Sequence, residues 1–160
     1  MLIGAAASVS AHDDGIDARL KGFQEVPAVS TVAKGRFKAS IDDRAGVIHY
    51  ELSYSGLEGT VTQSHIHLGQ RGVNGGVTMF LCQTATNPDP TGLAPTCPQS
   101  GTVTGMLAAA NVIGGAAAQG IAAMEFTEVL AALRAGVAYA NVHSSKFMGG
   151  EIRAQLRDDD

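Results

Sequence analysis

The sequence predicts an all-β domain, a Greek-key sandwich or barrel with one short helix. About eight short strand-like runs follow one another at a spacing of roughly 8–15 residues, and two of them alternate apolar and polar residues, which is typical of strands with one buried face. Many of the 20 glycines lie between these runs, where they favour turns. Only one stretch has the spacing of an amphipathic helix. Short strands separated by turn residues indicate a sandwich or a barrel.

The clearest strands lie in the first half of the chain. In 35–41 and again in 47–54, apolar residues occupy every second position. Turn-forming residues at 42–46 separate the two runs, so we expect them to pair as a hairpin. The strands expected along the whole chain are 16–21, 35–41, 47–54, 60–68, 77–82, 100–107, 137–143 and 151–156.

The helix is expected over 127–135. Thr127 can cap its first turn, and Glu128 suits the positive end of the helix dipole. An apolar stripe on one face is formed by Val129, Leu130 and Leu133. Gly136 follows at the position where a left-handed residue commonly ends a helix.

Length and charge limit the class of protein. A chain of 160 residues is expected to form one domain, here over 12–160, that buries a sizeable core. The net charge is only −4, the basic residues are scattered along the sequence, and Trp is absent. Neither a clustered basic footprint nor a base-stacking surface is expected, which argues against a nucleic-acid partner.

Residues 1–11 form a short apolar segment that ends in the small-x-small pattern of a signal-peptidase site. We interpret this segment as the remnant of a signal peptide; the alternative is an apolar N-terminal tail. Cleavage after Ala11 would leave His12 first, with an amine and an imidazole able to chelate copper. No other run approaches the ~20 apolar residues of a transmembrane helix.

Cys82 and Cys97 enclose a loop rich in Pro, Thr, Asn and Gly. In a protein exported to the periplasm or the medium they would form a disulfide. The alternative is a pair of thiolate metal ligands, but no histidine lies nearby in the sequence to complete such a site. We therefore expect a disulfide and a periplasmic or secreted protein.

The sharpest chemical signal is the pair His65 and His67, with His143 late in the chain. Residues i and i+2 of a strand point to the same face, so the pair is expected to lie side by side. A third imidazole from another strand would complete a site for one copper ion, or for one zinc ion. An oxidising compartment favours Cu(II). The alternative is a hydrogen-bonded cluster of structural histidines.

Three further residues are candidates for supporting roles at this site. His49, on the more polar face of its strand, is a possible fourth ligand, and Met148 a possible soft axial ligand. Glu151 is a candidate acceptor for the N–H of a ligand imidazole. The alternatives are a solvated His49, a core-filling Met148 and an ion network between Glu151 and Arg153.

The order of several motifs resembles the CHRD family, a domain named after chordin and widespread in exported bacterial proteins. The resemblance covers about residues 17–157 and departs from the family pattern at Ala140 and Ala154. The matching segments are 20–27 (LKGFQEVP), 65–69 (HIHLG), 72–75 (GVNG), 136–143 (GVAYANVH) and 150–153 (GEIR).

The resemblance implies an immunoglobulin-like β-sandwich or β-barrel with a poorly defined biochemical role. The His-x-His pattern with a distant third histidine is also similar to the copper half of copper–zinc superoxide dismutases, which are Greek-key barrels. The zinc loop of those enzymes has no counterpart in this sequence.

Two functions are therefore expected as rivals. The first is an exported protein that holds one copper or zinc ion through His65, His67 and His143, with superoxide disproportionation as its simplest redox reaction. The second is a metal-free extracellular module that binds protein through its loops and sheet faces. Whether the chain is an enzyme stays open, since the sequence has no nucleophile-elbow, phosphate-loop or dinucleotide motif.

Overall fold

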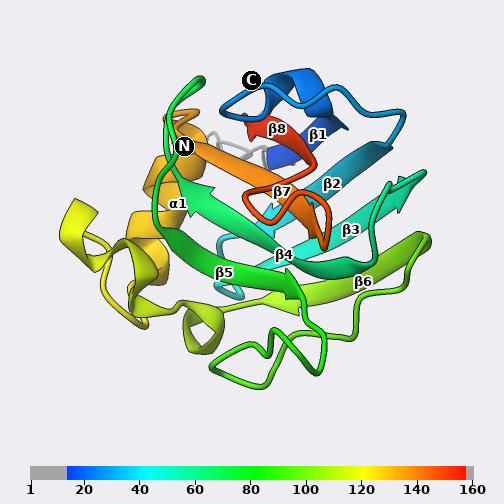
Figure 1. The fold of residues 1–160 in the computed structure, drawn as a ribbon. Coiled ribbons are helices and arrows are strands. Elements are labelled where there is room, and N and C mark those ends of the chain that lie inside the picture. Colours follow the sequence, from blue (N-terminus) through cyan, green and yellow to red (C-terminus); the bar gives the residue numbers. More distant parts are fainter. Residues whose placement is uncertain (1–13, 158–160) are drawn as a thin grey trace, which may run out of the picture.

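The chain folds into one eight-stranded antiparallel sheet, seen in a computed structural model that describes residues 14–157 (Figure 1). The strand order is β5-β4-β7-β8-β1-β2-β3-β6. The strands are β1 (Asp14–Lys21), β2 (Lys34–Asp42), β3 (Val47–Ser55), β4 (Val61–Leu68), β5 (Val77–Cys82), β6 (Gly101–Leu107), β7 (Ala138–Ser144) and β8 (Ile152–Leu156). The helices are η1 (Gly22–Gln24), η2 (Ala109–Asn111), η3 (Gly114–Gln119) and α1 (Phe126–Arg134).

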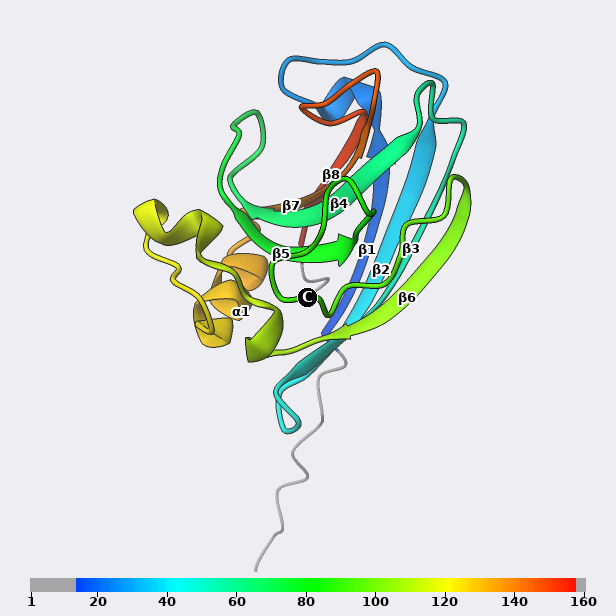
Figure 2. The same ribbon diagram turned by 60° about the horizontal axis from the view of Figure 1, so that its bottom comes forward.

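The sheet curls into a nearly closed barrel (Figure 2). Its two edge strands, β5 and β6, contact each other without forming a ladder. Tyr50 of β3 joins the two edges, because its Oη donates a 2.6 Å hydrogen bond to the carbonyl oxygen of Leu81 on β5. Gly105 of β6 leaves room for this ring, since a Cβ at that position would lie 2.5 Å from the Tyr50 Oη.

All of the expected strands form, with ends that differ by two residues at most. The hairpin of β2 and β3 is confirmed, with Phe37 opposite Leu52 and both side chains fully buried. Its turn contains Gly46 at φ 67°, in the left-handed region that favours glycine. The alternation in the sequence therefore identifies the residues that fill the inside of the sheet.

The expected α-helix is confirmed, but the expected capping residue is wrong. Thr127 lies inside the first turn, and Glu125 occupies the N-cap position. The Glu125 Oε2 accepts a 2.7 Å hydrogen bond from the backbone N–H of Ala122, which shapes the entry to the helix. Gly136 ends the helix at φ 67°, as expected. The alanine- and glycine-rich segment before the helix forms η2 and η3, which the sequence analysis did not predict.

Strands β4, β7 and β8 present two different faces. Ile66, Val142 and Ile152 point into the apolar core inside the curled sheet. The residues between them point to the outer face of the sheet, where the loops 69–76 and 145–151 cover them. These outward and yet buried residues are His65, His67, Asn141, His143 and Arg153.

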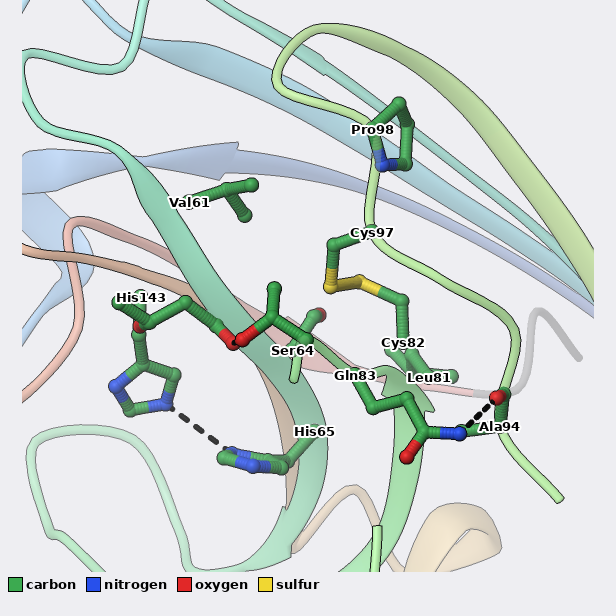
Figure 3. The surroundings of a disulfide bond; sticks show 12 residues. Val61, Ser64, His65, Leu81, Cys82, Gln83, Ala94, Cys97, Pro98 and His143 are labelled. Carbon is green, nitrogen blue, oxygen red and sulfur yellow. Dashed lines mark hydrogen bonds between the residues drawn. A yellow bond between two sulfur atoms is a disulfide. The ribbon is translucent and has the colours of Figure 1, made fainter. Parts of the chain in front are cut away.

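The expected disulfide is present between Cys82 and Cys97. Figure 3 shows it beside the segment of β4 that carries Ser64 and His65. The bond excludes the alternative of two thiolate metal ligands. Within residues 14–157 no helix has the length and apolar character needed to cross a bilayer. The proposed signal-peptide remnant, 1–11, lies outside the described residues.

Replacement of Gly105 by Ala tests the closure of the barrel. The added methyl group collides with the Tyr50 ring, so we expect the free energy of unfolding to fall by about 1–3 kcal/mol in urea titrations. Gly114→Ala is the matched control, because a Cβ there meets only the Ala123 backbone nitrogen at 3.9 Å. Equal losses in both variants would contradict a specific role for the Tyr50 ring, which packs on Gly105 of β6 and bonds to Leu81 of β5, in closing the barrel.

Candidate metal centre

Pairing between β4 and β7 brings the three candidate histidines together. His65 lies opposite Asn141 and His67 opposite Tyr139, while His143 lies opposite Gln63 at the next position on the same face. One ligand nitrogen from each histidine lies within 4.8 Å of the others. The side chains of all three histidines are more than nine-tenths buried. The alternation of β4 thus places His65 and His67 on one face, and β7 supplies the third imidazole.

Backbone carbonyls fix the position of the proton on two of these rings. Nδ1 of His67 lies 2.9 Å from the carbonyl oxygen of Gly75, and Nδ1 of His143 lies 2.9 Å from that of Met148. A carbonyl oxygen can only accept, so each Nδ1 donates and each Nε2 presents a lone pair. Both Nε2 atoms point at the Asn141 Oδ1, which lies 3.0 Å from each.

Burial keeps the three imidazoles neutral. Desolvation lowers the pKa of His65 to about 2 and the pKa of His67 to about 4. The pKa of His143 is lowered for the same reason. At neutral pH each ring therefore carries one N–H, and neither His67 nor His143 can donate from its second nitrogen.

Four atoms that can accept a hydrogen bond therefore meet here: Nε2 of His67, Nε2 of His143, Oδ1 of Asn141 and one ring nitrogen of His65. Too few protons are available to place a donor at each contact between them. Nδ1 of His65 lies 3.2 Å from Nε2 of His143, the contact drawn as a dashed line in Figure 3. A proton on this Nδ1 would satisfy that contact alone. It would leave His67 Nε2 facing Asn141 Oδ1, and His65 Nε2 buried without a partner among the described residues. Buried lone pairs without a donor are unfavourable, and a cation would stabilise them.

The distances suit a small metal ion. Zinc–nitrogen bonds of ~2.0–2.1 Å place neighbouring ligands of a tetrahedral site about 3.3 Å apart. The three contacts between the acceptor atoms measure 3.0 to 3.2 Å. The histidine nitrogens within 4.8 Å of one another need only a small inward movement to reach one ion. The residues present therefore fit a single cation bound by three nitrogens and one amide oxygen.

Arg153 holds the loop that supplies one of the orienting carbonyls. The residue is 1 % exposed, and its guanidinium donates to the carbonyl oxygens of Gln70 and Val73 and to Oδ1 of Asn74. These bonds place loop 69–76 over the sheet, and with it the Gly75 oxygen that binds His67. Gly75 must be glycine, because a Cβ would lie 1.6 Å from the Leu68 oxygen.

Aromatic rings hold two of the imidazoles in place. His67 stacks on Tyr139, with ring centroids 4.6 Å apart and planes inclined by 4°. The Arg153 guanidinium lies 3.4 Å from the centroid of the same tyrosine. His65 meets the Phe80 ring at a centroid distance of 4.3 Å in an edge-on arrangement. The rings are therefore packed as firmly as they are hydrogen-bonded, which favours one fixed ligand geometry.

The supporting residues expected from the sequence are not ligands in this structure. His49 is exposed on β3, away from the cluster. The Met148 side chain is 79 % exposed, and only its backbone oxygen reaches His143. Glu151 is buried, but its Oε1 accepts from the Thr31 hydroxyl and the Glu58 N–H, so it holds loops and orients no imidazole.

Asn141 is the functional candidate that the sequence analysis missed. Its neighbour Glu25 is also buried, and desolvation raises the pKa of that carboxyl to about 7 against the opposing effects of Arg153 and Asn141. A signal was present, since Asn-x-His on one strand repeats the spacing of His-x-His on another. Only the pairing of the two strands shows that the two patterns share a face.

Comparison with known proteins gives one result. The family model described as the CHRD domain matches residues 16–156, which is most of the chain. Neither curated proteins nor solved structures yield a match. The family match agrees with the resemblance in the sequence and carries no statement about a metal.

Acid is expected to destabilise the metal-free protein through the histidines. The folded-state pKa of His67, about 4, lies below the ordinary value of 6.5, so the unfolded chain takes up the proton first. Its contribution to stability is complete above pH 6.5 and is lost as the pH falls toward 4. The loss is about 3 kcal/mol for this ring alone.

Urea unfolding at pH 7.5 and pH 4, with a metal chelator present, measures this loss of stability. Glu25 acts in the opposite sense, because its raised pKa stabilises the folded state as the pH falls, so variants are compared rather than one curve. His67→Asn should lose less stability than the wild type between the two pH values, and the exposed His49→Asn should match the wild type. Identical pH dependence in all three proteins would refute the lowered pKa of His67 in the folded state.

Proposed function

The chain belongs to the CHRD domain family, and we propose that it binds one copper ion, with zinc as the alternative, through His65, His67 and His143. One observation carries the proposal: three neutral, buried imidazoles and an amide oxygen converge with too few protons to share. Imidazole nitrogen is a good ligand for both metals. The fixed Nδ1–H groups of His67 and His143 are the kind of outer hydrogen bond that orients metal-binding histidines.

We propose Asn141 Oδ1 as the fourth ligand atom. A site with four protein ligands is closed, whereas catalytic sites keep a position free for water or substrate. The proposed role is therefore to hold or store the ion. Superoxide disproportionation would require Asn141 to leave or a fifth position to open.

Export is part of the same proposal. The Cys82–Cys97 disulfide supports a periplasmic or secreted location, since such bonds persist in oxidising compartments. Residues 1–11 would then be a signal-peptide remnant and 12–160 the single mature domain. We also propose a Greek key for β3 to β6, because β3 lies beside β6 while β4 and β5 pair at the other edge of the sheet.

The rival function is a metal-free interaction module. It requires the four acceptor atoms to share protons in a purely structural cluster, with Asn141 turned so that its amide donates. Metal titration separates the two functions, because lone pairs that already accept hydrogen bonds must give them up to bind an ion, which weakens binding.

We predict that chelator-treated protein binds one equivalent of Cu(II) in calorimetric titration, with nitrogen hyperfine structure in the electron spin resonance spectrum. All proteins carry His12→Ala, so that the N-terminus does not contribute. His65→Ala, His67→Ala and His143→Ala should each weaken binding by about 100-fold or more, and Asn141→Leu by about 10- to 100-fold. His49→Ala is the matched control and should bind like the parent protein.

Equal uptake of copper by the parent and the three histidine variants would refute the site. Tighter binding of Zn(II) than of Cu(II), lost in the same variants, would keep the site and change the metal.

The closed site also predicts a low redox activity. The copper-loaded parent protein should disproportionate superoxide slowly, and Asn141→Ala should be about tenfold faster, because it frees a coordination position. Stopped-flow decay of superoxide measures both rates, with His49→Ala as the control. A parent protein that is as fast as the Asn141 variant would show that the amide is not a ligand.

A further inference from the structure

The lysines and arginines that are scattered along the sequence gather on one face of the folded sheet. Six of the 11 line two adjoining grooves, which share Arg19 and Lys21. Only one acidic side chain, Asp17, lines either groove, although the whole chain has a net charge of −4. We call this surface the basic face; its cations are Arg19, Lys21, Lys34, Arg36, Arg71 and Arg157.

The register of β1 and β2 sets like charges directly opposite each other. Arg19 faces Arg36 and Lys21 faces Lys34 across the ladder. Such pairs repel, and cross-strand neighbours of this kind normally destabilise a sheet. Arg36 is neutralised by a bidentate ion pair with Asp17. Within residues 14–157, Arg19, Lys21 and Lys34 have no carboxylate partner.

The grooves have the form of a site for an extended polar chain. The larger one has a volume of about 570 Å³ and crosses β1, β2, β3 and β6, the wall seen on one side of the barrel in Figure 2. Hydroxyl groups line its β3 and β6 side, from Ser53, Ser55, Ser100 and Thr102. Cations at i and i+2 lie about 7 Å apart along a strand, and paired cations about 5 Å apart across the ladder. Charges at these intervals, flanked by hydroxyl groups, match a polymer that carries an anion on each repeating unit.

We propose that the basic face binds a linear acidic polysaccharide, with carboxylate or sulfate groups. The cations pair with its anions, and the serine and threonine hydroxyls bond with its ring hydroxyls. The only aromatic residue in the lining, Tyr54, is 3 % exposed, so the face offers no ring for base stacking. Its apolar members, Ala18, Leu20 and Ala154, are also buried, so it offers no wedge for insertion into a lipid bilayer.

This inference does not rest on the metal site. The grooves contain none of the three histidines, and the cations are exposed where the histidines are buried. The two sites share the outer face of the same sheet and loop 69–76, which carries both Arg71 and the Gly75 oxygen that binds His67. His143 contacts the other loop, through the Met148 oxygen, so polysaccharide binding is expected to survive His143→Ala.

Binding to immobilised alginate, a polymer of uronic acids, and to dextran sulfate tests the proposal, with neutral dextran as the blank. Lys21→Gln with Lys34→Gln should weaken binding by about tenfold or more and flatten its salt dependence, because two ion contacts are lost. Arg44→Gln with Lys146→Gln removes the same charge elsewhere and should leave binding within about twofold of the wild type.

Three results would overturn the proposal: no binding to either polymer, equal weakening in both double variants, or tighter binding to duplex DNA or to phosphatidylglycerol vesicles. Thermal unfolding supplies the check on folding. The Lys21 and Lys34 double variant should melt no lower than the wild type, because it removes a repulsive pair. A lower melting temperature would contradict the repulsion on which the inference stands.

Discussion

The candidate metal centre depends on a shortage of hydrogen-bond donors at one point on the outer face of the sheet. His67 and His143 each spend their one N–H on a backbone carbonyl, so their Nε2 lone pairs meet at the Asn141 oxygen. Burial prevents a second proton from binding at neutral pH, because desolvation disfavours the imidazolium ion. A structural cluster would place a donor between acceptors. With the Asn141 amide oxygen turned toward the rings, no donor lies between His67 and Asn141, which is the arrangement expected of ligands; the opposite orientation of the amide would donate to both rings and form the structural cluster.

The loops around the site position the carbonyl oxygens of Gly75 and Met148, which orient His67 and His143. Holding one of these loops requires the burial of a charged side chain, Arg153. Arg153 is almost fully buried beneath loop 69–76, where oxygen atoms of that loop and the Tyr139 ring contact its guanidinium and the Glu25 carboxyl interacts with its charge. Glu151 is buried in the same way under its two neighbouring loops. Buried ionic groups of this kind are weak evidence for stability, since hydrophobic residues of similar size often stabilise as much. Their effect here is positional, because Arg153 fixes the loop that carries Gly75 and Glu151 ties together the segments that contain Thr31 and Glu58.

The sequence was sufficient for the periodic part of the fold and for part of the site. Period-two alternation located β2 and β3, short strand-like runs between turn residues located the other strands, and the spacing of two placed His65 beside His67, because none of these inferences needs knowledge of strand order. The order of the strands in the sheet could not be predicted from the sequence. The role of Asn141 could therefore not be predicted either, because it depends on the pairing of β4 with β7. The basic face was missed for the same reason, since Arg19 and Lys34 become neighbours only in the register of β1 with β2. Helix entry at Glu125 and the 3₁₀ turns depend on tertiary packing that local propensity does not encode.

The protonation of the imidazole nitrogens tests the central claim most directly. Long-range ¹H–¹⁵N correlation spectra of the metal-free protein at pH 7.5 distinguish the two neutral tautomers of each histidine. We expect His67 and His143 to carry the proton on Nδ1, with Nε2 unprotonated in both. Protonated Nε2 atoms on these two rings, or an Asn141 amide N–H hydrogen-bonded to either unprotonated Nε2 in the same spectra, would contradict the account and leave a structural cluster with no place for a cation.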